Sequence, residues 1–286
     1  MNIILRLIKI FPPEASHKIA LLSLYFLYKT GLLNQFFPKF NNQKIDFFGM
    51  SLSNRLGTAA GLDKDGDYID CLGALGFGFL EVGTVTPLAQ FGNPKPRVFR
   101  IFKEKAVINR LGFNNKGVDY LVKRLKNRKY KGIVGVNIGA NKNSKDQKRI
   151  DDYIECFRKV YKYSDYITVN ISSPNTPGLR DLHDLDNIKN LILNIENEAK
   201  LNNFNRPIFL KISPDESAET IKSIADLINL SNLTGLIISN TTIDKEILHD
   251  KKNIDIDGGL SGAPLMKKST EILKAINNHN PELPII

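Results

Sequence analysis

Short apolar runs alternate with amphipathic helical patterns over most of this chain, from about Leu56 onward. Runs of apolar and β-branched residues predict buried strands, and a 3.6-residue apolar periodicity between them predicts helices. The strands are expected at Leu56–Ala60, Phe79–Val82, Ile133–Ile138, Tyr166–Asn170, Ile208–Ile212 and Gly235–Ser239. The helices are expected at Tyr68–Leu75, Val118–Lys126, Tyr153–Val160, Leu185–Ala199, Ala218–Leu230 and Thr270–Ile276.

Repeated strand–helix alternation is typical of a parallel sheet with helices packed outside it. Six such units and the start of a seventh favour a (β/α)8 TIM barrel over a doubly wound sheet. The seventh strand begins at Pro284–Ile286, where the printed sequence ends, so we expect a barrel that is incomplete at its C-terminus. Val98–Phe102 and Ala106–Ile108 flank a short charged segment and predict a hairpin inserted after the second unit.

The N-terminal residues 1–44 are expected to form a separate helical element, and residues 45–286 the barrel. An apolar stripe up to Phe11 precedes Pro12-Pro13, which open a second helical pattern that runs to about Lys29. Its continuous apolar run of about ten residues is shorter than the ~20 needed to cross a bilayer, and no signal-peptide cleavage site follows. Apolar helices with basic flanks favour contact with a membrane surface; a helical cap packed on the barrel is the alternative.

Composition and cysteine usage narrow the class of protein. A formal net charge of +10 over 286 residues would suit a nucleic-acid binder, but the lysines are scattered and no nucleic-acid motif is present. We therefore expect no nucleic-acid partner. Cys71 and Cys156 lie far apart and lack the spacing of metal ligands, so they are expected to be packing residues of a protein without a metal site, in a reducing compartment.

Polar or glycine-rich loops follow the predicted strands, at the end where barrel enzymes carry their chemistry. Residues 59–64 (AAGLDK) combine small residues, which allow a flat ligand close to the backbone, with the cation of Lys64. Asp63 in this loop has a helix N-cap as its alternative role. Residues 109–115 (NRLGFNN) are dense in donors that suit a carboxylate or an imide. Lys211 lies in an apolar strand, where it either faces outward or needs an anionic partner.

The loop at residues 170–179 (NISSPNTPGL) contains hydroxyls, amides and two prolines directly after a predicted strand. The prolines fix φ, so the loop is expected to be stiff enough to hold a catalytic group. An ordinary Ser/Pro/Asn turn is the alternative. Amides, hydroxyls and two lysines around a barrel mouth, without paired carboxylates or a Ser/His/Asp set, favour a planar anionic cofactor and flavin redox chemistry.

Taken together, these segments resemble the dihydroorotate dehydrogenases, and most closely their membrane-associated, quinone-dependent class. The resemblance runs in order along nearly the whole chain. The segments that carry it are AAGLDKDG (59–66), EVGTVTP (81–87), GNPKPRVFR (92–100), NRLGFNN (109–115), VNIGAN (136–141), VNISSPNTPGLR (169–180), LKISPD (210–215), SNTT (239–242) and GGLSG (258–262).

The resemblance implies FMN at the barrel mouth, oxidation of dihydroorotate to orotate in pyrimidine synthesis, and a membrane quinone as the final electron acceptor. Ser173 would be the base that removes the proton from C5 while a hydride leaves C6 for flavin N5. A cysteine holds this position in the soluble class, and neither cysteine of this chain lies on such a loop. Lys211 would lie near flavin N1 and stabilise the reduced anion.

The resemblance assigns residues to both ligands. Those expected to hold FMN are Ala60, Gly61, Leu62, Asp63, Lys64, Thr84, Asn137, Asn170, Lys211, Ser239 and Gly262. Those expected to hold the substrate are Lys64, Asn109, Arg110, Leu111, Gly112, Phe113, Asn170, Asn175, Asn240 and Thr241. His17 is a candidate for the quinone path, with a structural role as the alternative.

The resemblance also implies a monomeric, peripheral protein on the cytoplasmic face of a bacterial cell membrane, with the N-terminal helices in contact with that membrane. Family members continue past the position of Ile286 with segments that hold the FMN phosphate, so we expect weakened FMN binding. A non-catalytic remnant that binds no flavin is one alternative. A flavin barrel acting on RNA is another, but it would need a catalytic cysteine on a strand-end loop and a basic RNA-binding domain, and the sequence contains neither.

Overall fold

Five parallel strands form the centre of the protein in the computed structural model, which describes residues 10–36, 44–172, 184–249, 252 and 255–286. The strand order follows the chain, β3-β6-β7-β8-β9, and every neighbouring pair is parallel. The bounds are Phe79–Val85 (β3), Ile133–Ile138 (β6), Tyr166–Asn170 (β7), Ile208–Lys211 (β8) and Gly235–Ile237 (β9). The expected parallel sheet of a barrel-type α/β fold is confirmed.

Two further segments extend this sheet at its edges. Gly57 forms a parallel bridge with Phe79, so the predicted first strand lies beside β3, but as an isolated bridge rather than the regular strand that we expected over Leu56–Ala60. At the other edge, Leu236 and Ile285 form a parallel bridge. The C-terminal residues therefore lie beside β9, where the predicted seventh strand would begin.

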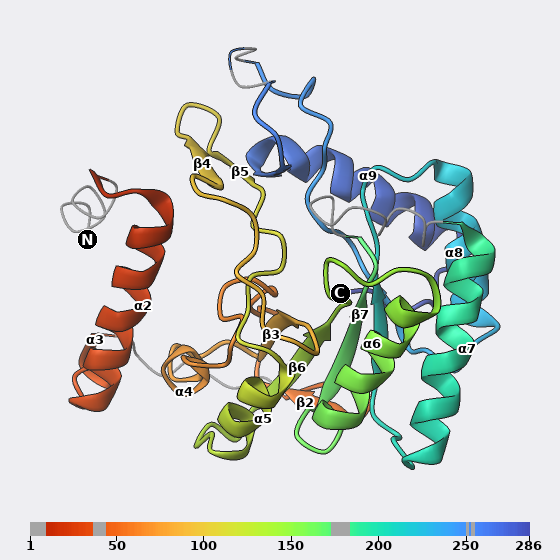
Figure 1. Cartoon of the computed structure of the whole chain (residues 1–286), viewed down its shortest axis with the longest axis horizontal. Helices are drawn as coiled ribbons and strands as arrows, with labels where there is room; N and C mark the ends of the chain where they lie inside the picture. The colour runs from red at the N-terminus through yellow and green to blue at the C-terminus, as the bar shows by residue number, and fades with distance from the viewer. Residues whose placement is uncertain (1–9, 37–43, 173–183, 250–251, 253–254) are drawn as a thin grey trace.

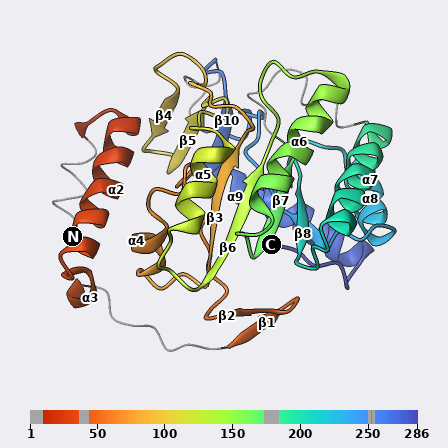
Figure 2. The ribbon, with the colours of Figure 1, turned by 60° about the horizontal axis from the view of Figure 1, so that its bottom comes forward.

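Helices on the outer side of the sheet follow the strands (Figure 1, Figure 2). Their bounds are Ile69–Gly73 (α4), Val118–Lys126 (α5), Asp146–Val160 (α6), Leu185–Leu201 (α7), Ala218–Asn229 (α8) and Ala263–His279 (α9). Helices α6 and α9 begin seven residues before their predicted starts. The first two turns of α6 are mostly polar and lack apolar periodicity, and those of α9 follow directly on a glycine-rich segment and contain a proline. A proline in the first turn of α9 suits its early start.

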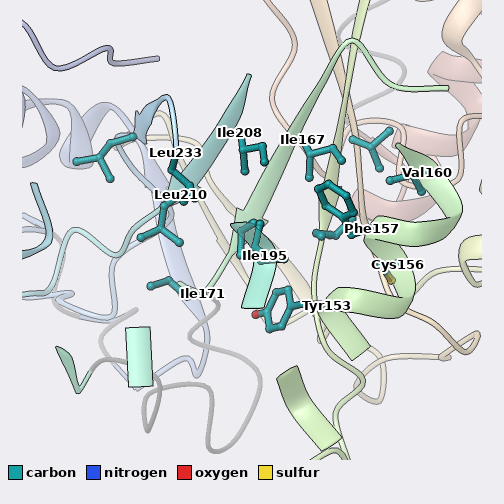
Figure 3. Close-up of a cluster of buried hydrophobic side chains, with 14 of the residues drawn as sticks. Tyr153, Cys156, Phe157, Val160, Ile167, Ile171, Ile195, Ile208, Leu210 and Leu233 are labelled. Atoms are coloured by element: carbon teal, nitrogen blue, oxygen red, sulfur yellow. The ribbon is translucent and has the colours of Figure 1, made fainter. Parts of the chain in front are cut away.

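The main core lies between these helices and the sheet. Figure 3 shows Tyr153 and Phe157 of α6 beside Ile167 of β7 and Ile195 of α7, and all four side chains are fully buried. The Tyr153 hydroxyl donates to the carbonyl oxygen of Asn170 at 2.7 Å, so its polar atom is satisfied inside the core. Cys71 and Cys156 are buried free thiols, as expected for packing residues, and burial raises the pKa of Cys71 to about 11.

Two sheets of short strands surround the parallel sheet, and the sequence predicted only part of them. The hairpin β1–β2 (Ile45–Phe47, Met50–Leu52) lies below the sheet in Figure 2 and was not predicted, because three-residue strands carry almost no periodicity. Its side chains form a second core cluster with Tyr166, Phe209 and Ile237 at the lower end of the sheet. The predicted inserted hairpin is β4–β5 (Val98–Ile101, Ala106–Asn109).

The strand β10 (Gly259–Gly262) pairs antiparallel with β5 and completes a three-stranded sheet with the inserted hairpin. The sequence predicted no strand in this glycine-rich segment. The register of β10 places Gly262 opposite Ala106, and Gly262 has φ +97°, so its conformation favours glycine. A Cβ atom at this position would lie 2.4 Å from the Lys105 carbonyl oxygen, so glycine also allows the close pairing.

The N-terminal element contains α2 (Pro13–Lys29) and α3 (Leu33–Phe36), while most of the first predicted apolar stripe lies outside the described residues. Helix α2 begins at Pro13 and ends before Gly31, as predicted. It packs on α4 and β4, and Glu14 pairs with Arg97 at 2.9 Å. Among the described residues, none of the helices combines the length and the apolar character that crossing a membrane requires.

Candidate active site

A cavity of about 440 Å³ lies at the carboxyl ends of the strands, between the parallel sheet and the inserted hairpin. Its walls come from segments that are far apart in sequence. The lining residues are Ala59, Ala60, Gly61, Lys64, Thr84, Val98, Val107, Asn109, Leu111, Gly112, Phe113, Asn170, Lys211, Ser239, Asn240, Thr241, Ser261 and Leu265. Parallel strands bring their carboxyl ends to one rim, which is why these loops meet here.

Most of the residues that the sequence assigned to ligands line this cavity. Leu62 and Asp63 line a neighbouring cavity instead. Asn137 is fully buried behind Thr84, and Gly262 is the N-cap residue of α9. The Arg110 guanidinium donates to the carbonyl oxygen of Pro96 at 3.0 Å, away from the cavity lining. Ser173 and Asn175 lie outside the described residues.

A buried carboxylate anchors the polar groups beneath the cavity. Glu81 on β3 is 4% exposed and accepts hydrogen bonds from three side chains of the neighbouring strands. Asn137 Nδ2 donates to Oε1 at 2.9 Å, while the Tyr166 hydroxyl at 3.0 Å and the Thr168 hydroxyl at 2.8 Å donate to Oε2. Burial beside this carboxylate raises the pKa of Tyr166, so its hydroxyl stays protonated and donating.

From Asn137 the hydrogen bonds continue toward the cavity. The Thr84 hydroxyl donates to Asn137 Oδ1 at 2.6 Å and accepts from Asn170 Nδ2 at 2.9 Å. The Ser172 hydroxyl donates to Asn170 Oδ1 at 3.0 Å and accepts from Asn240 Nδ2 at 3.0 Å. Cavity-lining side chains of β3, of β7 and of the loop after β9 are thereby joined into one network, because each buried polar group needs a partner.

Lys211 at the end of β8 is the group whose environment most clearly indicates a ligand. Its side chain lines the cavity and is only 8% exposed, which excludes the outward-facing alternative. It forms no hydrogen bond or ion pair with any other residue that the structure describes. Because a buried ammonium without a partner is costly, the cavity is suited to an anionic or acceptor group next to Lys211.

A second cavity, of about 290 Å³, lies between α2 and the barrel. Helix α2 contributes Pro13, Glu14, His17 and Leu21 to its walls. The two cavities share Gly61, Lys64, Val98 and Leu111 as lining residues, so they are neighbours separated only by these side chains and backbone segments.

Lys64 lies at this junction. Its Nζ donates to Asn114 Oδ1 at 2.6 Å. Burial, together with the positive charge of Arg97, lowers the pKa of Lys64 to about 8. An anion bound in either cavity would favour the protonated form of this lysine.

The sequence allowed Asp63 a helix N-cap as its alternative role, but the N-cap residue of α4 is Tyr68, and Asp63 instead binds the backbone just before this helix. Its carboxylate accepts from the backbone N–H groups of Asp67 at 2.9 Å and Tyr68 at 2.8 Å, immediately before α4. Burial outweighs these hydrogen bonds and raises the pKa of Asp63 to about 6. The carboxylate therefore stabilises the loop that carries Lys64, and it is not part of the wall of the larger cavity.

Five cavity-lining residues were not singled out from the sequence as ligand contacts, namely Ala59, Val98, Val107, Ser261 and Leu265. The alternation within the inserted hairpin could have found one of them. Ala106 and Ile108 of β5 are buried in a small core, so Val107 and Asn109 must face the other way, toward the cavity. The wall formed by β10 could not be inferred, because no strand was predicted in that glycine-rich segment.

A parallel α/β barrel with its cavity at the strand ends has the architecture of a barrel enzyme. Comparison with known families identifies the enzyme class. The family model described as dihydroorotate dehydrogenase matches residues 43–286. The chain belongs to the dihydroorotate dehydrogenase family and is an oxidoreductase of its quinone-dependent class.

Individual relatives agree with this assignment. A dihydroorotate dehydrogenase (quinone) of Saccharophagus degradans is 47% identical over 96% of this chain and 82% of its own length. The protein of the same name from Mannheimia succiniciproducens is 46% identical over 96% of this chain and 83% of its own length. A crystal structure of the Eimeria tenella dihydroorotate dehydrogenase in complex with ferulenol aligns with a TM-score of 0.84 and 33% identity, over 96% of this chain and 79% of that one.

The raised pKa of Asp63 predicts a specific pH dependence of stability. The folded state holds this proton up to about pH 6, whereas the unfolded chain loses it near pH 4, so stability falls as pH rises between these values. At about 1.4 kcal/mol per pKa unit, the contribution is roughly 3 kcal/mol. Urea unfolding from pH 4 to 7 should show this loss for the wild type relative to Asp63→Asn. Unfolding free energies of the two proteins that run parallel across this range would contradict the assignment.

Proposed function

We propose that the larger cavity binds FMN together with dihydroorotate, and that the buried Lys211 is the main electrostatic contact to the flavin. The observation that carries this proposal is a buried cation that lines the cavity without a partner among the described residues. The other lining groups suit the same ligand. Ala59, Ala60 and Gly61 leave room for a flat ring close to the backbone, and Thr84 and Ser239 add polar contacts.

In this proposal FMN supplies the hydride acceptor, and the protein supplies the proton chemistry and the orientation of the substrate. Ser173 removes the proton from C5 of dihydroorotate. A serine hydroxyl is a weak base, so the site must pass this proton onward. Ser172, directly before Ser173, is bonded to Asn170 and Asn240, which supports a fixed start for the catalytic loop.

The substrate has a carboxylate and ring carbonyl groups, which need hydrogen-bond donors. We propose Asn109, Asn240 and Thr241 as substrate contacts, together with the backbone of Leu111–Phe113 and with Lys64, because all of them line the cavity. The expected contacts from Arg110 and Asn175 stay predictions, and so do those of Leu62, Asp63, Asn137 and Gly262 with FMN. The lowered pKa of Lys64 means that burial disfavours its charged form. A bound substrate carboxylate would stabilise that charged form.

The second cavity is proposed as the quinone site. It adjoins the larger cavity at Lys64 and Gly61, so a quinone held there would lie next to the reduced flavin. Its walls combine apolar groups such as Leu21, Leu62 and Val98 with polar groups. The polar wall residues are Glu14, His17, Asp63, Lys64, Asp65, Asp67, Tyr68 and Asn114. Burial, and the nearby charge of Lys64, lower the pKa of His17, which favours the neutral imidazole at physiological pH.

Helix α2 is proposed to lie on a membrane surface, from which the quinone enters. Ile19, Leu22 and Phe26 are exposed large apolar residues at positions i, i+3 and i+7, so they share one face of the helix, and Phe26 is 64% exposed. Lys18 and Lys29 on the same helix are cations that suit anionic headgroups. The protein would then be a peripheral monomer on the cytoplasmic face, with residues 1–44 as its membrane element.

Replacement of the proposed base tests the catalytic assignment. Ser173→Ala should slow flavin reduction by dihydroorotate by about two to four orders of magnitude, because general base catalysis contributes roughly that much. Orotate affinity should change little, because the hydroxyl acts mainly on the reacting proton. Anaerobic stopped-flow bleaching of the flavin measures the first quantity and orotate titration the second. Ser269→Ala on α9 is the matched control, and a normal reduction rate in Ser173→Ala would place the base elsewhere.

A bulky side chain in the second cavity should impair the reaction with quinone without affecting flavin reduction by dihydroorotate. His17→Trp should raise the KM for quinone several-fold or more while flavin reduction by dihydroorotate stays normal, because the indole fills space next to α2 only. Leu193→Trp, on the exposed face of α7 and outside both cavities, is the control and should leave both half-reactions unchanged. Equal quinone kinetics in the two variants would exclude this cavity as the quinone site.

A further inference from the structure

Five side-chain hydrogen bonds run in a single direction from the cavity to Glu81. Asn240 donates to Ser172, Ser172 to Asn170, Asn170 to Thr84, Thr84 to Asn137, and Asn137 to Glu81, at 2.6 to 3.0 Å. The four members between Asn240 and Glu81 each accept from the side facing the cavity and donate toward the barrel interior. Serine, threonine and asparagine can all both donate and accept, so none of them sets this direction alone.

Glu81 sets it at the interior end of the chain. At the cavity end, the backbone N–H groups of Ser172 and Thr241 donate to Asn170 Oδ1 at 3.2 Å and to Asn240 Oδ1 at 2.8 Å and favour the same direction. A carboxylate accepts on both oxygens and donates on neither, so Asn137 must turn its Nδ2 toward Glu81 and its Oδ1 toward Thr84. The Thr84 hydroxyl then donates to Asn137 and is left to accept from Asn170. The same constraint passes through Ser172 to Asn240.

The consequence for the cavity is that amide N–H groups, and not amide oxygens, are left for a ligand. Asn170 Oδ1 is used by Ser172, and Asn240 Oδ1 by the backbone N–H of Thr241 at 2.8 Å. Each of these two asparagines retains one N–H beyond its bond in the chain, and both residues line the cavity. A ligand with carbonyl or carboxylate oxygens at these positions is complementary, and one with donors there is not.

We propose that Glu81 is a positioning residue that fixes the donor direction of this chain and thereby makes the cavity selective for ligands rich in acceptor oxygens. Glu81 does not line the cavity and acts only through Asn137. The identity of the ligand, orotate, rests on the proposed function.

The substitution Glu81→Gln should reverse the chain for a physical reason. The single amide oxygen of glutamine would be claimed by two buried hydroxyls, Tyr166 and Thr168, which otherwise lose their acceptor. The glutamine NH2 group would then face Asn137, whose amide has to turn over. To pass along the chain, the reversal must also break the backbone hydrogen bonds from Ser172 to Asn170 Oδ1 and from Thr241 to Asn240 Oδ1. It would then present amide oxygens to the cavity, where they face the oxygens of orotate.

The test is calorimetric titration of orotate into protein saturated with FMN. Glu81→Gln should weaken orotate binding by about tenfold to a hundredfold, the usual cost of mismatched buried hydrogen bonds. Tyr166→Phe is the control, because it removes a donor to Glu81 and lowers the melting temperature but keeps the chain direction, so orotate binding should stay within about twofold. Orotate binding in Glu81→Gln equal to that of the wild type would overturn the proposal.

A rescue variant distinguishes the effect of the donor direction on orotate binding from the effect of lower protein stability. In Glu81→Gln combined with Tyr166→Phe and Thr168→Val, no hydroxyl competes for the glutamine oxygen, so Asn137 can donate to it again. Orotate binding should recover although the melting temperature falls further, which a purely structural role of Glu81 does not predict. If this variant does not fold, the contrast between Glu81→Gln and Tyr166→Phe decides alone. Wild-type protein that binds no orotate would instead contradict the proposed function.

Discussion

The polar groups on the strands beneath the mouth of this barrel are buried, and each must therefore find a partner within the protein or in a ligand. That requirement explains two features of the site, the hydrogen-bonded cluster around Glu81 and the position of Lys211. Glu81 gathers Asn137, Tyr166 and Thr168 into a satisfied centre. Lys211, equally buried, finds no such partner among the described residues. The hydrogen bonds around Glu81 make the site rigid, and Lys211 leaves a place for an anionic ligand.

The arrangement of the two cavities follows from the fold. The strands deliver the polar loops to one rim, and α2 lies against the same region through the Glu14–Arg97 pair and its contacts with α4 and β4. Gly61 and Lys64, from the loop beside β3, form part of both cavities. One short loop thus separates the place proposed for the flavin and substrate from the place proposed for the quinone, which suits two half-reactions that share a flavin but not a binding site.

Much of this could be predicted from the sequence, for identifiable reasons. The bounds of α5, β6 and β7 were correct to the residue, because these segments have strong apolar patterns between clear turn signals. The hairpin β1–β2 and the strand β10 were missed, because strands of three or four residues, one of them glycine-rich, carry almost no periodicity. Their existence depends on tertiary pairing.

The sequence predicted which residues belong to the site better than it predicted where their side chains lie. Ser239, Asn240 and Thr241 line the cavity as expected from their place after a strand. Asn137 also ends a strand, but it lies fully buried behind Thr84, and strand position alone could not separate a cavity wall from a supporting side chain. Glu81 appeared in the sequence only as part of a motif, since its role depends on two neighbouring strands.

The central claim, that the cavity beside Lys211 holds a flavin reduced by dihydroorotate, is tested most directly by the visible absorption spectrum of the purified 286-residue chain. The spectrum should be recorded anaerobically, before and after addition of dihydroorotate, with FMN added first if the protein is isolated without it. The account predicts a bound flavin whose absorption bleaches on addition of dihydroorotate. A protein that remains colourless after incubation with FMN and removal of the excess, or a bound flavin that dihydroorotate does not bleach, would contradict it.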